Sequence, residues 1–463
     1  MSEIAFLCHP TVGHLNTLLS MALRMGEEGH STRFFIPTAP SLPFRLRPDI
    51  LNNAVDVPVS VERMGLALER VALPFATVFH AILLSRSSGY PEVRRAQSLF
   101  AGGVVPTARD IIRRMERQRP DVMVLDFTFH AGQLAAEKLG IPYVSIYHSG
   151  LPFRGPGVPP FGSGLPIGTA DPTQLRAAEA AEQELVGLIR GKLESARRAL
   201  GLGLGPGPED FLRSPSSPWL NLIPSHECLE APRTGLGPST FYIGPCFATR
   251  RGHAAESFPF ERLEPGAFKV YVSLGTVFNN RPEVFRTLIE ALDTPGVQTI
   301  VSAGASYAEL SAGKLPGNVL LFRRVPQVEL LPRVDLVIGH GGNNTTNETL
   351  ASGKPLLVIP VGGEQQDNSR RVELIGAGVS LRPEQLSVDK VRQAVKRLRE
   401  EPSFAQKARE LQARLDETDG TGTAARLIAW LAQHKAPLRT PEGTSRSLTR
   451  EAAQQLLRAA PAA

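Results

Sequence analysis

Short apolar runs alternate with longer segments of helical periodicity along most of the chain. The apolar runs lie at residues 4–8, 32–36, 122–126, 141–147, 219–223 and 241–245, and again at 270–274, 297–301, 319–323, 334–338 and 355–359. Continuous apolar runs of this length are typical of parallel strands buried on both faces, and their alternation with helices predicts doubly wound α/β sheets. We therefore expect an α/β protein with more than one such sheet.

The length of 463 residues exceeds what a single ordinary core accommodates, so we expect two domains. The pattern predicts a first domain at 1–245, a polar interdomain linker at 246–264, a second domain at 265–423 and a C-terminal helix with a tail at 424–463. Helices are expected at 15–25, 90–118, 173–200, 424–434 and 448–460. The glycine-rich segment 201–208 follows a helix instead of a strand, which favours a flexible linker over a phosphate loop.

Composition excludes several classes of protein. The chain is 42% hydrophobic and 21% charged, without an apolar run long enough to span a bilayer or a signal-peptide pattern at its start, so we expect a cytoplasmic protein without an integral membrane segment. The net charge of +6 arises from 51 basic and 45 acidic residues spread along the sequence, which argues against nucleic acid as a partner. Three scattered cysteines predict buried thiols and no zinc site.

The segment 323–371 has the most unusual residue spacing in the chain. An apolar run at 334–338 ends in the glycine turn Gly339-His340-Gly341-Gly342, and a helix should follow, with residues 343–346 supplying capping side chains. Helical spacing places four residues on one face: Gly341, Asn344, Thr345 and Glu348. Free N–H groups at the start of this helix suit a phosphate, and a carboxylate one turn further in suits sugar hydroxyls.

Three further strand ends carry candidate chemistry. Gly275-Thr276 offers a second turn with N–H groups and a hydroxyl for phosphate. His14 follows the first strand without a G-x-G-x-x-G, which argues against an ordinary NAD-dependent dehydrogenase, and Asp126 ends the strand at 122–126. Taken alone, His14 is equally compatible with a helix N-terminal group, and Asp126 with a cap for a helix starting near Thr128.

Together these motifs resemble the donor-binding signature of family 1 glycosyltransferases, which use nucleoside-diphosphate sugars. Val325-Pro326-Gln327 resembles the start of that signature, and the sequence from Pro360 to Asn368 its sugar-reading end. The resemblance assigns the following residues to the donor: Gly275, Thr276, Arg324, Val325, Gln327, His340, Gly342, Asn344, Thr345, Glu348, Glu364 and Gln365.

Two residues depart from the family pattern. Arg324 stands where plant members place a tryptophan against the base, although a planar guanidinium also stacks on a base. Glu364 stands where an aspartate is usual, which leaves the identity of the sugar more open.

The resemblance implies a GT-B architecture of two Rossmann-like domains facing each other across a cleft. It implies an inverting transfer of a sugar, with UDP-glucose preferred and deoxythymidine donors open, to a hydroxyl of a hydrophobic small-molecule acceptor. His14 would be the general base and Asp126 its partner, with the diphosphate at His340, Asn344 and Thr345. Residues 38–118 would shape the acceptor pocket, and the helix at 424–434 would brace the first domain. No separate cofactor is implied, and the absence of a D-x-D motif predicts activity without a divalent metal.

Three alternatives remain open at the level of the sequence. The first two are other GT-B enzymes, a nucleotide-sugar epimerase or a transferase acting on a lipid-linked or peptidoglycan intermediate. The third is a non-catalytic accessory protein that retains the fold, against which the presence of both His14 and Asp126 argues.

Overall fold

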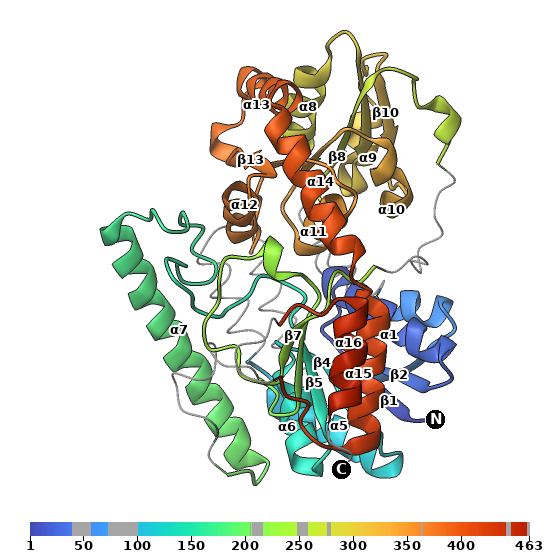
Figure 1. Ribbon diagram of the computed structural model, residues 1–463, viewed down its shortest axis with the longest axis vertical. Coiled ribbons are helices and arrows are strands. Elements are labelled where there is room, and N and C mark those ends of the chain that lie inside the picture. Colours follow the sequence, from blue (N-terminus) through green and yellow to red (C-terminus); the bar gives the residue numbers. More distant parts are fainter. Residues whose placement is uncertain are drawn as a thin grey trace.

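Two parallel sheets, each flanked by helices, form the protein. The computed structural model describes residues 1–38, 57–72, 101–203, 205, 216–247, 258–275, 279–362, 364–440 and 446–460. Figure 1 shows one sheet with its helices above the other. The predicted α/β class with two doubly wound sheets is confirmed.

The first sheet is parallel throughout and has the order β3-β2-β1-β4-β5-β6-β7. Its strands are β1 (Glu3–Leu7), β2 (Ser31–Thr38), β3 (Ala67–Ala72), β4 (Val122–Asp126), β5 (Tyr143–Ile146), β6 (Leu220–Ile223) and β7 (Thr240–Tyr242). The order reverses at β1, which pairs with β2 on one side and with β4 on the other. The segments that follow β1 and β4 therefore start next to each other at the carboxyl edge, where ligands bind in such sheets.

The helices that accompany this sheet are α1 (Val12–Glu27), α5 (Val104–Arg117), α6 (His130–Leu139) and α7 (Pro172–Ala199). Helix α1 buries Leu15, Leu18 and Met21 in the same core as Phe6 of β1. Because α1 begins five residues after β1 ends, its first turn lies at the carboxyl edge of the sheet.

The second sheet is also parallel, with the order β10-β9-β8-β11-β12-β13. Its strands are β8 (Phe268–Ser273), β9 (Val297–Ser302), β10 (Val319–Phe322), β11 (Leu336–Gly339), β12 (Leu356–Val358) and β13 (Gly378–Ser380). Its helices are α8 (Pro282–Leu292), α9 (Tyr307–Ser311), α10 (Gln327–Leu330), α11 (Asn343–Ala351), α12 (Gln365–Leu374), α13 (Val388–Glu400) and α14 (Pro402–Asp416). We call this unit the C-terminal domain, and the unit built on the first sheet the N-terminal domain.

The last two helices return to the N-terminal domain. Figure 1 shows α15 (Gly420–His434) and α16 (Arg450–Ala459) beside the first sheet, and α15 packs against α1. Leu427 and Leu431 belong to the same buried core as Phe6. The backbone N–H of Tyr242 donates to the carbonyl of Arg446, so the tail also pairs with the last strand of the first sheet. The return segment is thus part of the N-terminal core.

Several elements differ from the sequence-based expectation. Strands β3 and β13 were not predicted, because ALERVA is half polar and GVS is too short to show periodicity. The helix expected at 90–118 is observed from Val104 to Arg117, and its first eleven expected residues lie outside the described ranges. Most of 38–118 and half of the glycine-rich segment 201–208 lie outside them as well, as do residues 248–257 of the expected linker.

The end of the expected linker belongs to the C-terminal domain. Phe258 is buried against Tyr271 of β8 in one apolar cluster, and the backbone N–H of Glu264 donates to the side chain of Gln298. The C-terminal core therefore begins before residue 265, because an aromatic side chain in this polar segment is buried.

The cysteines are free thiols, but only Cys8 is buried, while Cys228 and Cys246 are half-buried. The expectation of three buried thiols is therefore wrong for two of them. Within the described ranges, no helix combines the length and the apolar character that crossing a bilayer requires.

Candidate active site

His14 and Asp126 meet at the carboxyl edge of the first sheet. His14 lies in the first turn of α1, and Asp126 is the last residue of β4, which pairs with β1. The distance from His14 Nδ1 to Asp126 Oδ2 is 2.5 Å. The His14 side chain is 22% exposed, whereas that of Asp126 is fully buried. The sequence placed these two residues at one sheet edge, and the structure brings them into direct contact.

Asp126 also caps the turn that follows it. Its Oδ1 accepts hydrogen bonds from the backbone N–H of Thr128 at 2.9 Å and from the Thr128 hydroxyl at 2.8 Å. The helix-cap interpretation of Asp126 is therefore wrong, because α6 begins at His130 with Phe129 as its N-cap and without a side-chain cap. Oδ1 of Asp126 instead caps the turn before that helix, while Oδ2 faces His14. The local capping bonds fix the carboxylate plane that faces His14.

Charge stabilises this pair in its ionised form. Burial by itself would raise the pKa of Asp126, but the charges of His14 and His148 and their hydrogen bonds hold that pKa well below its usual range. Burial by itself would lower the pKa of His14, but the charge of Asp126, its hydrogen bond and the charge of Glu364 together raise it above the ordinary value. A carboxylate that stays ionised both orients the imidazole and stabilises its protonated form.

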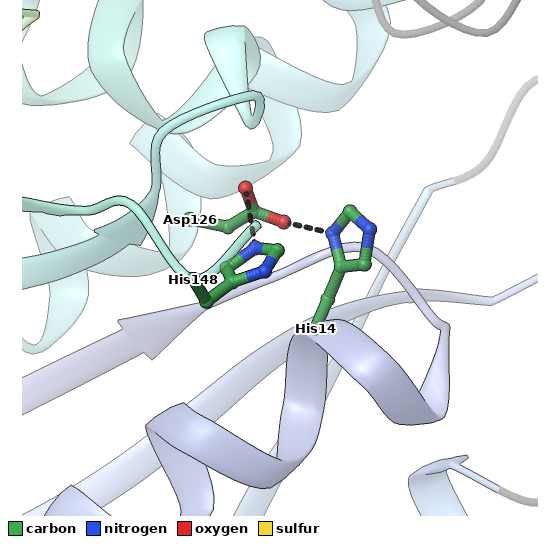
Figure 2. A group of neighbouring side chains, drawn as sticks. All are labelled: His14, Asp126 and His148. Carbon is green, nitrogen blue, oxygen red and sulfur yellow. Dashed lines mark hydrogen bonds and ion pairs between the residues drawn. The ribbon is translucent and has the colours of Figure 1, made fainter. Parts of the chain in front are cut away.

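His148 is a third member of this cluster, and sequence reasoning did not assign it a role. Its Nε2 lies 3.2 Å from Asp126 Oδ1, and its side chain is 2% exposed. Figure 2 shows the Asp126 carboxylate linked by dashed lines to both imidazole rings. The available signal was its position, because His148 follows the end of β5, at the same edge of the sheet as His14.

The cluster of His14, Asp126 and His148 offers one ligand atom from each residue, all within 4.8 Å of one another. This spacing is compatible with a metal ion. In the structure, however, the two imidazoles face opposite oxygens of one carboxylate, which is the arrangement of a hydrogen-bonded acid–base group. We therefore interpret it as such a group.

Helix α11 directs its N-terminus toward the N-terminal domain, where Asn344 contacts Gly13. Gly342 is its N-cap residue and no side chain caps the helix, so the expectation that residues 343–346 would cap it is wrong. Their side chains are directed elsewhere, as described below for the asparagines. The first N–H groups of an uncapped helix suit an anionic group such as phosphate.

His340 is wedged between two glycines beside this N-terminus. A Cβ atom on Gly275 or on Gly342 would come within 2.4 Å of His340 Nε2, so these glycines leave the space that the ring occupies. Burial lowers the pKa of His340 to about 4, which keeps the imidazole neutral at physiological pH. Its Nδ1 is buried without a hydrogen-bond partner among the described residues.

Glu348 lies one turn further along α11 and is held by Gln327. The Gln327 amide donates to Glu348 Oε2 at 2.5 Å and approaches Thr345 Oγ1 at 3.4 Å. The hydroxyl of Tyr271 in turn donates to Gln327 Oε1 at 3.0 Å. The structure therefore brings Gln327, Thr345 and Glu348 together, as the sequence spacing suggested.

The start of the segment 323–371, which the resemblance assigns to the donor, is partly exposed. Arg324 is exposed, and Val325 packs against the cluster that contains Phe258. Thr276 lies outside the described residues, so its predicted contact with phosphate stays a prediction.

Comparisons with known proteins agree with this geometry. Residues 217–418 match the family described as UDP-glucoronosyl and UDP-glucosyl transferase. The chain is 27% identical over 437 residues to 4'-demethylrebeccamycin synthase of Lentzea aerocolonigenes, covering 91% of this chain and 97% of that protein. It is 26% identical to demethyllactenocin mycarosyltransferase of Streptomyces fradiae, covering 93% and 87%. The chain is a glycosyltransferase, and its residues 217–418 resemble the UDP-glycosyltransferase family.

Its fold has solved counterparts. The crystal structure of CalG4, the calicheamicin glycosyltransferase, superposes on the glycosyltransferase with a TM-score of 0.70, at 20% identity, covering 94% of this chain and 100% of that one. The predicted GT-B architecture is therefore confirmed.

Three asparagines of α11 connect the two domains of the glycosyltransferase. Asn343 donates its side-chain amide to the carbonyl of His148 at 2.8 Å, Asn344 to that of Gly13 at 3.1 Å, and Asn347 to that of Pro224 at 3.2 Å. Asn344, which the sequence assigned to the donor diphosphate, thus contacts the N-terminal domain in this structure. The donor segment and the segments that carry both imidazoles are joined directly.

The segment from Pro360 to Asn368, which resembles the family's sugar-reading end, lies near the carboxyl edge of the first sheet. Glu364 is half-buried, and its charge contributes to the raised pKa of His14. Gln365 is buried and turned toward its own loop, since its Oε1 accepts from the backbone N–H groups of Val361 and Gly362. Of the two residues predicted to read the sugar, Glu364 lies near His14, whereas the side-chain oxygen of Gln365 is already engaged in hydrogen bonds.

The glycosyltransferase also has an interdomain contact at Asp367 that the sequence did not reveal. The Asp367 carboxylate accepts hydrogen bonds from the backbone N–H groups of Gly162 and Gly164, at 2.5 and 2.8 Å. Burial raises the pKa of Asp367 to about 6, although both hydrogen bonds oppose that shift. The long loop after β5 is thereby fixed against α12.

Proposed function

We propose that the protein transfers a hexose from a nucleoside-diphosphate sugar, preferably UDP-glucose, to a hydroxyl of a hydrophobic natural-product acceptor, with inversion at the anomeric carbon. The observation that carries this proposal is the contact between His14 and Asp126 at the edge that faces α11. The relatives, named for rebeccamycin and lactenocin chemistry, support an acceptor of this class. One of them is named for a mycarosyl group, so deoxysugar donors belong in the test.

In the proposed reaction His14 removes the proton from the acceptor hydroxyl. Asp126 occupies Nδ1, and Figure 2 shows the other ring nitrogen pointing away from the carboxylate. As the acceptor oxygen forms its bond to the anomeric carbon, the bond from that carbon to the diphosphate oxygen breaks. The electron pair leaves with the nucleoside diphosphate and the proton stays on His14. A single displacement of this kind inverts the anomeric configuration.

The C-terminal domain would stabilise the leaving group. The uncapped N–H groups of α11 and the neutral His340 would face the diphosphate, and Thr345 would add a hydroxyl. Glu348, held by Gln327, would accept hydrogen bonds from the ribose. Glu364 would read the sugar hydroxyls beside His14.

The test is a screen of phenolic, macrolide and terpenoid alcohols against UDP-glucose and a deoxythymidine-diphosphate deoxysugar, read by mass spectrometry. We expect a product heavier by one hexose, with β configuration in its NMR coupling, and a better rate with UDP-glucose. His14→Ala should retain donor binding and lose on the order of 10²- to 10⁴-fold in kcat. Turnover of the donor without an acceptor would favour an epimerase, and a near wild-type rate for His14→Ala would refute the general base.

A further inference from the structure

His148 is the least exposed imidazole of the catalytic cluster. It follows β5, its side chain is 2% exposed, and its Nε2 lies 3.2 Å from Asp126 Oδ1. Its ring centre is 4.3 Å from that of His14, at an interplanar angle of 54°. Asp126 therefore has one imidazole that reaches solvent and one that does not. The buried ring has no access to an acceptor, so a role in the reaction has to pass through Asp126.

The position of His148 is set from the other domain. Asn343 of α11, itself 6% exposed, donates to the His148 carbonyl at 2.8 Å. Arg371 donates to Asn343 Oδ1 at 2.9 Å and is paired with the buried carboxylate of Glu230. Buried polar groups that are joined by such hydrogen bonds favour one geometry, because breaking one of these bonds leaves a desolvated group without that partner.

We propose that His148 is a positioning residue for the catalytic pair, holding Asp126 in the orientation that serves His14, and that Asn343 fixes His148 there when the domains meet. This inference rests on the proposed function of His14 as the base. The residue acts on the reaction through Asp126 and does not touch the substrate. Through Asn343, the domain that carries the donor segment would set the basicity of a residue in the other domain.

The physical argument concerns the two oxygens of Asp126. Oδ1 receives the Thr128 N–H, the Thr128 hydroxyl and the approach of His148, while Oδ2 faces His14. A hydrogen-bond donor at Oδ1 withdraws charge from the carboxylate. Without His148 the Asp126 carboxylate therefore accepts the hydrogen bond of His14 more strongly. This raises the pKa of His14.

Other charged groups around His14 are left unchanged by a substitution at His148. Within the part of the chain that the structure describes, the groups that face His14 include His9 on the segment after β1, with ring centres 6.0 Å apart, Asp126 on β4, His148 after β5, and Glu364 before α12. His14 works as a base only when it is deprotonated. A higher pKa therefore moves the ascending limb of the pH–rate profile to higher pH.

The experiment measures kcat/KM for a hydroxyl acceptor found in the screen, at saturating donor, as a function of pH in the full-length protein. His148→Leu removes the N–H and should move the ascending limb to higher pH by about 0.5 to 1 unit, a loss of about 3- to 10-fold on the acid side. The high-pH plateau should change far less. His148→Gln retains an N–H at the position of Nε2, so its ascending limb should lie at the same pH as in the wild type.

A second set of variants tests the proposed coupling between His148 and Asn343 of the C-terminal domain. Asn343→Ala should shift the limb in the same direction, and the double variant Asn343→Ala/His148→Leu should shift it no further than His148→Leu alone, because both act through one contact. Asn347→Ala is the matched control. It also removes a hydrogen bond between the domains, to Pro224, but it does not touch His148, so its limb should stay at the wild-type position.

Two results would overturn the inference. One is a His148→Leu profile with a lowered plateau and an unmoved limb, which is the signature of a purely structural role. The other is an unmoved limb in Asn343→Ala, which decides the matter if His148→Leu does not fold. In either case an inactive His14→Ala would leave the proposed function intact, whereas an active His14→Ala would remove the basis of both.

Discussion

The side-chain amide of Asn344 donates a hydrogen bond of 3.1 Å to the backbone carbonyl of Gly13, the residue directly before His14. The hydroxyl of Thr17 on the same helix approaches Asn344 Oδ1 at 3.4 Å. The first turn of α11 and the first turn of α1 are thus joined across the two domains. The residue before the proposed base is held by the helix proposed to bind the donor diphosphate.

This contact predicts that Asn344→Ala lowers kcat/KM about 2- to 10-fold, because one hydrogen bond contributes about 0.5 to 1.5 kcal/mol. Asn344→Asp is the sharper variant, since it keeps an acceptor for Thr17 but loses the N–H that reaches Gly13. Steady-state kinetics with varied donor and acceptor would measure both. Wild-type kinetics in Asn344→Asp would show that the bond to Gly13 has no role in turnover.

Glu348 is predicted to set the affinity for the donor. Glu348→Ala removes the carboxylate held by Gln327 and should raise the donor KM, while the acceptor KM changes little, because the acceptor does not reach this helix turn in the proposed geometry. Gln327→Ala should show a smaller effect of the same kind, since it frees the carboxylate without removing it. An unchanged donor KM in Glu348→Ala would contradict the assignment to the ribose.

Gly342 is predicted to be intolerant of a side chain. In Gly342→Ala the new Cβ would come within 2.4 Å of His340 Nε2, and relief of such a clash in a packed site costs about 1 to 3 kcal/mol. We expect a lower Tm and weaker binding of UDP, measured by thermal unfolding and calorimetry. Gly26→Ala in α1 is the control, because no described atom outside its own stretch of helix lies within 4 Å of its Cβ position. Equal Tm values and equal UDP binding in Gly342→Ala and Gly26→Ala would show that His340 moves aside freely.

His9 is predicted to make the fold sensitive to acid. Burial lowers its pKa to about 4, so the unfolded chain binds the proton more readily than the folded one. The stability that neutral His9 contributes is therefore present above pH 6.5 and is lost as the pH falls from 6.5 toward 4. Its Nε2 contacts the Thr128 carbonyl at 3.2 Å, a contact that the amide of His9→Gln can retain without titrating. The decrease in Tm between pH 7 and 5 should be smaller in His9→Gln than in the wild type. An equal decrease would exclude His9 as a source of the acid sensitivity.

Transfer is predicted to proceed without a divalent metal. The leaving diphosphate would be met by the N–H groups of α11, His340 and Thr345, so EDTA should leave kcat within about twofold of its value in untreated enzyme. Magnesium or manganese added after EDTA should give no increase. Complete loss of transfer that either ion restores would contradict this account of the leaving group.

Much of the fold follows from local patterns in the sequence. Apolar runs such as 122–126 are long enough and sufficiently β-branched to predict strands, and a polar group at the end of a parallel strand points to the carboxyl edge. The spacing of Gly341, Asn344, Thr345 and Glu348 likewise predicts one face of one helix. For the same reason the sequence selects His14 and Asp126 as candidates, although it cannot supply the distance between them.

Tertiary structure decides the relations between residues that are remote in the chain. Asn343 and Asn344 look like capping residues in the sequence, because that is the local use of asparagine at a helix start. In the folded protein they reach His148 and Gly13 instead, since docking of the second domain provides carbonyl groups that the isolated helix lacks. The role of His148 is hidden for the same reason. Its partner is chosen by the order of strands in the sheet and by burial between two domains, neither of which any local pattern of residues encodes.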